Sequence, residues 1–226
     1  MIYFDNVTKE YRDGTPALEE VTLTINPKEF VSIVGQSGAG KTTLVKTLLA
    51  ELKPSSGSVF FESVDIHTLP STSLHHYRRK LGTVFQDFRL IPNKTAYENI
   101  AFAMEAAGRP DDEIESDVPY ILDLVDLSDK AEHFPWQMSG GEQQRVAIGR
   151  AIVNQPDVII ADEPTGNLDP VNTFEIMEIL KKINELGTTI ILTTHNKGVV
   201  DAMKKRVITM EKGRVVRDDP NGHYIL

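Results

Sequence analysis

The sequence predicts an α/β fold with a mostly parallel sheet, because apolar runs typical of buried strands alternate with helical patterns. Three nearly continuous apolar runs lie at Phe30–Val34, 158–161 and 189–192, as expected for strands covered on both faces. Apolar residues at helical spacing separate these runs. The carboxyl ends of parallel strands meet at one edge of a sheet, so we expect a ligand to bind there.

Two helices are predicted between these strands. Four leucines recur at helical spacing after the first run and precede turn-forming residues at 54–57: Leu44, Leu48, Leu49 and Leu52. Between the second and third runs, a helical face is formed by Phe174, Met177, Leu180 and Ile183 or their neighbours.

Two further elements are predicted outside this alternation. Val21, Leu23 and Ile25 alternate with polar residues, which indicates a half-buried strand. Residues 206–216 have the pattern of a hairpin around Lys212 and Gly213.

The chain is expected to form one domain over residues 1–226, since it has no internal repeat, low-complexity tract or flexible linker. The segment 88–153 reads as largely helical. We therefore expect a core of about residues 1–87 and 154–226, with a helical subdomain of about residues 88–153 inserted into it.

Composition argues against several functions. A net charge of −9 and a pI near 5.2 make a broad basic surface for nucleic acid or anionic lipid unexpected. The densest basic stretch, 75–80, is interpreted as the solvated face of a helix, with partner docking as the alternative. Cysteine is absent, so a metal must be held by oxygen or histidine. No apolar run approaches the roughly 18 residues of a spanning helix, and the start lacks a signal-peptide pattern, so we expect a cytosolic protein.

A glycine-rich segment follows the first buried run and has the pattern of a phosphate-binding loop: Gly35, Gln36, Ser37, Gly38, Ala39, Gly40, Lys41, Thr42 and the adjoining Thr43. Backbone N–H groups of such a loop face phosphates, the lysine reaches the β and γ oxygens, and Thr42 can hold Mg²⁺. A glycine-rich turn before a helix is the alternative, which the position between strand and helix disfavours.

An acidic pair, Asp162 and Glu163, ends the second buried run. A carboxylate beside a phosphate loop can hold Mg²⁺, which is the role expected of Asp162. Glu163 is placed to polarise an attacking water. Acidic residues are common at strand ends, so this pair is informative only together with the phosphate loop.

A third segment, Ser139-Gly140-Gly141, has Glu142 three residues after its serine. This spacing predicts a capping box at a helix start. The same helix start, with two bare glycines, is also suited to bind a second phosphate group. One ATP does not need two such sites from one chain.

These segments, with Gln86, 167–169 and His195, occur in the order seen in ATP-binding cassette ATPases, and the chain resembles that family over nearly its whole length. The resemblance implies a P-loop fold with a RecA-like, mostly parallel core, an antiparallel β subdomain and an inserted helical subdomain. It also implies an ATP-dependent head-to-tail homodimer.

The resemblance further assigns roles at the site. ATP would lie between Lys41 of one subunit and the Ser139 segment of the other. Gln86 would contact Mg²⁺ and the attacking water, and His195 the γ-phosphate. Asp169 would couple the two sites, and Tyr11 would stack on adenine. One departure from the family is Gly149, where relatives often have alanine; it is expected to cost about 1 kcal/mol in its helix.

Within the family, residues 85–95, 134–138 and 142–145 resemble the cell-division ATPases of bacteria. That resemblance implies a separate membrane partner of the permease type, a peripheral position on the inner face of the cell membrane, and control of cell-wall hydrolases. The alternative is the lipoprotein-release or macrolide-export group. A DNA-acting chromosome-maintenance head is disfavoured, because the segment between Gln86 and Ser139 is too short for a long coiled coil. A scaffold without turnover is disfavoured by Glu163.

Overall fold

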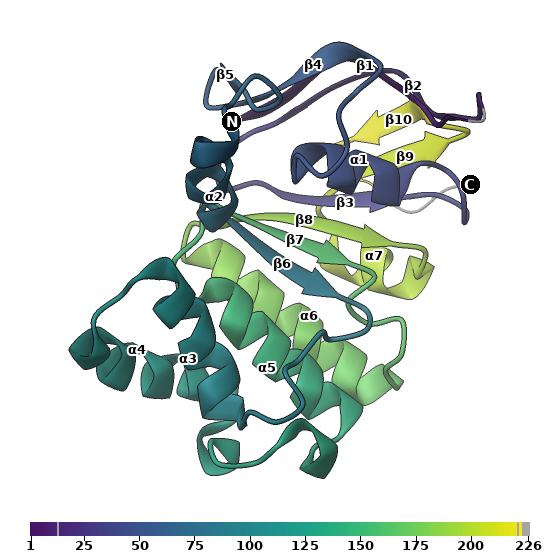
Figure 1. Ribbon diagram of the computed structural model, residues 1–226. Coiled ribbons are helices and arrows are strands. Elements are labelled where there is room, and N and C mark those ends of the chain that lie inside the picture. Colours follow the sequence, from purple (N-terminus) through teal and green to yellow (C-terminus); the bar gives the residue numbers. More distant parts are fainter. Residues whose placement is uncertain (13, 221, 223–226) are drawn as a thin grey trace.

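A six-stranded sheet runs through the middle of the molecule (Figure 1), seen in a computed structural model that describes residues 1–12, 14–220 and 222. Its strand order is β10-β9-β3-β8-β7-β6. The strands are β3 Phe30–Val34, β6 Leu81–Phe85, β7 Val158–Asp162, β8 Thr189–Thr194, β9 Arg206–Glu211 and β10 Arg214–Asp219. Neighbours pair in parallel except β10, which is antiparallel to β9. The predicted α/β fold is confirmed.

The central strands are buried because helices cover both faces of this sheet. Every residue of β3 and β8 is buried, which explains their nearly continuous apolar runs. Val34 of β3 pairs with Thr194 of β8, and Asp162 of β7 pairs with Thr193. The carboxyl ends of the three strands therefore lie at one edge.

A second, antiparallel sheet covers one side of the molecule, in the order β2-β1-β4-β5. Its strands are β1 Ile2–Glu10, β2 Pro16–Ile25, β4 Ser56–Phe61 and β5 Val64–Asp65. The helix α1, Lys41–Leu48, lies between the two sheets (Figure 1), where Leu44 and Leu48 join one apolar cluster with residues of both.

The first helix is shorter than its leucine pattern predicts. α1 ends at Leu48, Leu49 caps it, and Ala50 has a left-handed φ of 52°. Leu52 therefore lies beyond the helix, since the backbone turns after Leu49 well before the proline at position 54.

Helices cover the opposite face of the central sheet. Between β6 and β7 the chain forms α3 Ala96–Ala107, α4 Asp111–Leu124, two short 3₁₀ turns at Ser128–Lys130 and Pro135–Gln137, and α5 Gly140–Ile152. After β7 comes α6, Pro170–Glu185. Residues of α3, α4, α5 and α6 share one apolar cluster with Ile159 and Leu192 of the sheet. The division into core and inserted subdomain stays a prediction.

The apolar face of α6 differs from the predicted one at its first member. Met177, Leu180 and Ile183 are buried together with Ile176, whereas Phe174 is 65% exposed. Phe174 lies near the start of α6, where the helix borders a groove shared with the short helix α7, Lys197–Met203, rather than the sheet.

Gly149 lets α5 pack closely against α3 and α4. A Cβ at this position would lie 2.9 Å from Cδ1 of Ile100 and 3.2 Å from Cγ2 of Ile121. Glycine costs about 1 kcal/mol in helix propensity relative to alanine. Alanine would instead introduce an overpacking cost of about 1–3 kcal/mol. Glycine here is explained by the packing of the helices.

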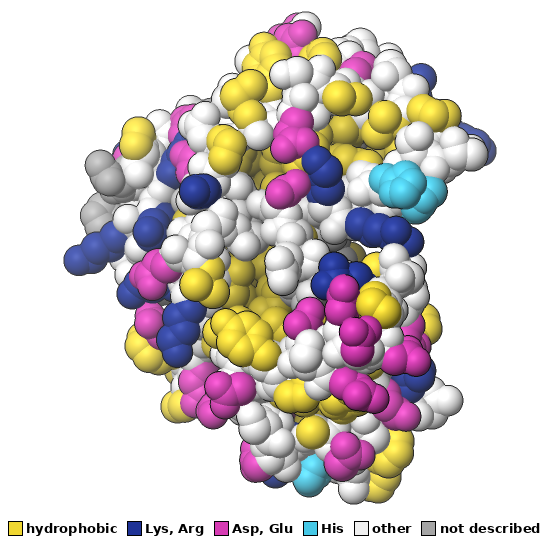
Figure 2. Space-filling model, turned by 90° about the vertical axis from the view of Figure 1, so that its left-hand side faces the viewer, with side chains coloured by type: hydrophobic (Ala, Val, Ile, Leu, Met, Phe, Trp, Pro, Cys, Tyr) yellow, Lys and Arg dark blue, Asp and Glu magenta, His cyan; other side chains and the backbone are white. Residues whose placement is uncertain are grey.

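The basic stretch at 75–80 belongs mostly to α2, Ser71–Arg79. Arg78 donates to the carbonyls of Leu49 and Ala50, and Arg79 donates to the carbonyl of Ala106. These arginines tie α2 to its neighbours in addition to facing solvent. On the side of the molecule where α2 lies, Lys and Arg side chains are interspersed with Asp and Glu (Figure 2). Among the described residues, no helix combines the length and apolar character needed to cross a bilayer.

Candidate functional site

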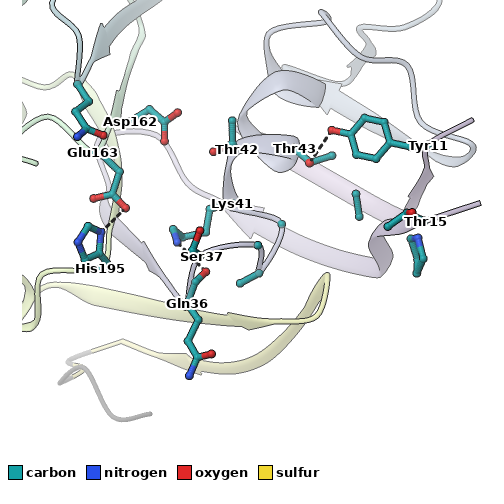
Figure 3. A pocket seen from close by; sticks show the side chains of 16 residues that line it. Tyr11, Thr15, Gln36, Ser37, Lys41, Thr42, Thr43, Asp162, Glu163 and His195 are labelled. Atoms are coloured by element: carbon teal, nitrogen blue, oxygen red, sulfur yellow. Dashed lines mark hydrogen bonds and ion pairs between the residues drawn. The ribbon is translucent and has the colours of Figure 1, made fainter. Parts of the chain in front are cut away.

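A cavity of about 720 Å³ opens beyond the carboxyl ends of β3, β7 and β8 (Figure 3). Its lining gathers most of the predicted site residues: Tyr11, Gln36, Ser37, Gly38, Ala39, Gly40, Lys41, Thr42, Thr43, Gln86, Asp162, Glu163 and His195, joined by Thr15, Pro16 and Ala17. Cavities of this volume hold ligands of nucleotide size. The predicted edge of the sheet is thus the place where these residues meet.

The glycine-rich loop connects β3 to α1 and curls tightly around the cavity. Gly40 has a φ of 103°, and a Cβ there would lie 2.6 Å from the carbonyl oxygen of Ala17, so only glycine fits. The N-terminus of α1 has no side-chain cap. Its first N–H groups and its dipole are therefore available to an anion.

Lys41 is the first residue of α1 and is 8% exposed. Its Nζ donates to the carbonyl oxygens of Gly35 at 2.7 Å and Gln36 at 3.2 Å. The ammonium group is thus held inside the curl of the loop (Figure 3), where incoming phosphate oxygens can replace carbonyl oxygens as its partners.

The acidic pair lies on the opposite side of the loop from Tyr11 (Figure 3). Asp162 ends β7, and its Oδ1 accepts a hydrogen bond from Oγ1 of Thr193 on β8. Glu163 has a left-handed φ of 50°, a conformation that costs a non-glycine residue about 1–2 kcal/mol. Its N–H donates to the carbonyl of Thr193 at 3.0 Å, which holds this turn.

His195 follows β8 and pairs with Glu163. Nδ1 of His195 lies 2.9 Å from Oε1 of Glu163 (Figure 3). Two of the three residues for which the sequence predicted a catalytic role therefore contact one another at the cavity.

Gln86 follows β6 and forms a reciprocal pair with Asn167. Nε2 of Gln86 donates to Oδ1 of Asn167 at 3.0 Å, and Nδ2 of Asn167 donates to the carbonyl of Gln86 at 3.2 Å. A Cβ on the adjacent Gly166 would lie 2.8 Å from Nε2 of Gln86, so glycine there makes room for the glutamine side chain.

Tyr11 borders the far side of the cavity and is 44% exposed. Its hydroxyl forms a 3.3 Å hydrogen bond with Oγ1 of Thr43 on α1 (Figure 3). This contact holds the phenol ring beside the phosphate loop with much of its surface open to solvent.

Ser139, Gly140, Gly141 and Asp169 do not line this cavity. The capping box is present: Oγ of Ser139 accepts from the N–H of Glu142 at 3.3 Å, and Oε2 of Glu142 accepts from the N–H of Ser139 at 2.7 Å. Gly141 is buried, and a Cβ there would overlap the side-chain oxygen of Asn172 at 1.7 Å. Its missing side chain lets α5 approach α6.

Asp169 caps the start of α6. Its Oδ1 accepts from the N–H groups of Val171 and Asn172 at 2.9 and 3.0 Å. The bond from the backbone of Asn172 is the main cause that lowers the pKa of Asp169 below its usual value. Asp169 and Gly141 thus both contact Asn172 and meet at the junction of α5 and α6.

Three residues of this arrangement were missed by the reading of the sequence: Asn167, Asn172 and Thr193. Asn167 lay within the motif 167–169 but received no role of its own. Thr193 belongs to a buried strand that contains two further threonines, Thr189 and Thr194, so the sequence does not single it out.

The parallel sheet, the phosphate loop before α1 and the acidic pair after β7 define a P-loop nucleoside triphosphatase. A family model described as "ABC transporter" matches residues 18–166. The chain therefore belongs to the ABC transporter family, as its motifs predicted.

Relatives of known name and structure are similar over nearly the whole chain. The "Cell division ATP-binding protein FtsE" of Bacillus subtilis is 50% identical over 224 residues, which cover 99% of this chain and 98% of that protein. The protein of the same name in Escherichia coli strain K12 is 41% identical over 215 residues, covering 95% and 97%.

A solved structure has a similar fold. The ATP-binding cassette MJ0796, in a dimeric post-hydrolysis state bound to ADP and Pi, aligns with a TM-score of 0.88 and 38% identity, over 99% of this chain and 100% of that one.

Proposed function

We propose that this chain binds ATP between two copies of itself and hydrolyses the γ-phosphate. The observation that supports this most is a split in the site. The phosphate loop, the acidic pair, Gln86 and His195 line one cavity, whereas the Ser139 helix start lies outside it. A helix start that serves no phosphate in its own chain is suited to the nucleotide of a second copy.

Each residue then has a role in hydrolysis. Lys41 and the N–H groups of the loop bind the β- and γ-phosphates, and Tyr11 stacks on adenine. Glu163 accepts the proton of a water that attacks the γ-phosphorus, so that the bond to the ADP oxygen breaks and ADP and phosphate form. His195, paired with Glu163, orients that carboxylate and contacts the γ-phosphate.

The residues expected to hold Mg²⁺ fit such an ion. Thr42, Gln86 and Asp162 offer hydroxyl, amide and carboxylate oxygens to one cavity, and oxygen donors are what this hard cation prefers. The described residues contain no cluster of three or more His, Asp or Glu side chains that could hold a metal alone. Phosphate oxygens of ATP would complete the shell, and the ion would neutralise charge that develops on them.

The relatives support a cell-division role over lipoprotein release or macrolide export, because the named proteins compared above are FtsE proteins. In this role, ATP-driven closure of the dimer acts on a membrane partner of the FtsX type and through it on peptidoglycan hydrolases. The chain would then work in the cytoplasm, peripheral to the inner face of the cell membrane. Its acidic composition supports no role for nucleic acid.

Two substitutions test the proposal. Glu163→Gln keeps the size of the side chain but removes the base, so ATP still binds and a stable dimer accumulates while turnover falls by roughly 10²- to 10⁴-fold. Lys41→Ala removes the phosphate contact, so both ATP binding and dimer formation are lost. Light scattering measures dimer formation in both variants, and a phosphate-release assay measures their turnover. Unchanged turnover in Glu163→Gln would overturn the proposal. So would a chain that binds ATP and remains a monomer.

A further inference from the structure

The segment that carries Gln86 has a strained backbone that begins two residues after it. Phe88 and Arg89 are consecutive non-glycine residues with left-handed φ angles of 57° and 51°. This conformation is unfavourable for residues with a side chain, and it persists only where neighbouring groups hold it. The strain therefore points to contacts that fix the segment from outside.

Arg150 of α5 provides two of these contacts. Its Nη1 donates to the carbonyl of Arg89 at 2.6 Å and its Nη2 donates to the carbonyl of Phe88 at 3.0 Å. The guanidinium is half-buried, and within the described part of the chain it makes no ion pair with a carboxylate. A charged group held mainly by the carbonyls of two strained residues is placed to fix the backbone conformation of those residues.

Gln144, also on α5, holds the other side of the same segment. Nε2 of this fully buried side chain donates to the carbonyl of Phe85 at 3.3 Å, and its Oε1 has no partner among the described residues. Burying an amide with one unsatisfied atom is unfavourable. The contact to Phe85, the residue before Gln86, accounts for burying this amide despite the cost.

α5 thus binds the carbonyls on both sides of Gln86, at Phe85 before it and at Phe88 and Arg89 after it. Figure 1 shows the loop that leaves β6 running past α5 on its way to α3, in agreement with these contacts. The side chain of Gln86 itself is held by Asn167. The backbone that flanks Gln86 is therefore held by α5, and Asn167 binds both the side chain and the backbone carbonyl of Gln86.

We propose that Arg150 and Gln144 are positioning residues for ATP hydrolysis, which hold the backbone around Gln86 so that its side chain faces the cavity. This inference rests on the proposed function, because it requires Gln86 to act on Mg²⁺ and the attacking water. α5 begins next to Ser139, so the helix that meets the partner's nucleotide also sets Gln86 in its own chain.

The test uses the purified full chain with Arg150→Met and Gln144→Met, which keep side-chain volume but remove the bonds to the carbonyls. A misplaced Gln86 should lower kcat by about tenfold and raise the Mg²⁺ concentration for half-maximal activity, while ATP affinity changes by less than about twofold. Arg150→Lys, which keeps a donor, should be intermediate. Arg79→Met is the matched control, since Arg79 also donates to a carbonyl, that of Ala106, and should behave as the parent chain.

A double-mutant cycle separates positioning from general stability. If Arg150 acts through Gln86, adding Arg150→Met to Gln86→Ala should lower kcat by less than about twofold further. A full additional loss of about tenfold, or unchanged kcat and Mg²⁺ dependence in both single variants, would overturn the inference. Circular dichroism checks folding. If Arg150→Met does not fold, the result with Gln144→Met decides the test.

The outcomes also separate this inference from the proposed function. If Gln86→Ala leaves kcat unchanged, the role of Gln86 in hydrolysis fails, and the inference fails with it. If Gln86→Ala lowers kcat while Arg150→Met and Gln144→Met do not, the proposed function stands and only the positioning role is wrong.

Discussion

His195 and Glu163 form a pair at the cavity in which the histidine is the more exposed partner. Nδ1 of His195 lies 2.9 Å from Oε1 of Glu163, and the exposed fractions of the two side chains are 68% and 19%. The carboxylate is thus sheltered at the end of β7, and the imidazole reaches it from the solvent side. We infer from this relationship that His195 orients the carboxylate of Glu163, the proposed base.

Replacing His195 by alanine should therefore impair turnover more than binding. Without its partner the Glu163 carboxylate can rotate away from the attacking water, and a displacement of about 1 Å costs up to about 10²-fold in rate. We expect kcat to fall by about 10- to 100-fold and ATP affinity to change only a few-fold. Steady-state ATPase assays and equilibrium binding measure the two effects. The exposed Lys197 offers a control, Lys197→Ala; an equal loss there would contradict the assignment.

Tyr11 should contribute to nucleotide affinity through its ring. Tyr11→Phe loses only the hydrogen bond to Thr43, so its affinity for ATP should stay within about twofold of the parent chain. Tyr11→Ala loses the stacking surface, worth about 0.5–1.5 kcal/mol, and should weaken binding by about 2- to 10-fold. Titration with a fluorescent ATP analogue measures both. Equal affinities of the two variants would show that the ring does not contact the base.

Gly82 of β6 is required by close packing rather than by chemistry. A Cβ there would lie 2.5 Å from the backbone oxygen of Ala151 on α5, which cannot move as a side-chain tip can. Gly82→Ala should lower the free energy of unfolding by about 1–3 kcal/mol. Gly198→Ala in α7 is the control, because its nearest neighbour would be 3.4 Å away. Urea denaturation measures both, and equal stability would refute the packing argument.

The capping box of α5 should make stability depend on pH through Glu142. The bond from the backbone of Ser139 is the main cause that lowers the pKa of Glu142. A carboxyl group with a lowered folded pKa stabilises the fold above its unfolded pKa, about 4.3, and this contribution is lost as the pH falls through the folded value.

Glu142→Gln removes the titrating group, so the parent chain should be more stable than this variant at neutral pH. That difference should shrink as the solution is acidified below about pH 5. Denaturation midpoints at several pH values measure it. A difference that does not vary with pH would show that the charge of Glu142 contributes nothing.

Elements with a local signature could be predicted from the sequence. β3, β7 and β8 could be recognised because parallel strands covered on both faces have nearly continuous apolar runs. The hairpin of β9 and β10 was marked by Lys212 and Gly213, which both have positive φ. The antiparallel sheet came only from the family resemblance, since pairings such as Ile2 with Phe61 join distant parts of the chain.

The same limit applies to the site. Lys41, Asp162 and Glu163 could be found because each lies at a fixed place in a local motif. The pairs of Gln86 with Asn167 and of Asp162 with Thr193 join residues 81 and 31 positions apart. Only the folded sheet brings these together, so no spacing along the chain could reveal them.

The central claim is that the Ser139 helix start of one chain completes the ATP site of another. It is tested most directly by a crystal structure of Glu163→Gln with ATP and Mg²⁺. We expect two chains facing each other, with Ser139 of each within hydrogen-bond distance of the γ-phosphate that the partner's Lys41 holds. ATP bound at Lys41 with the Ser139 helix start turned away from every triphosphate would contradict the account.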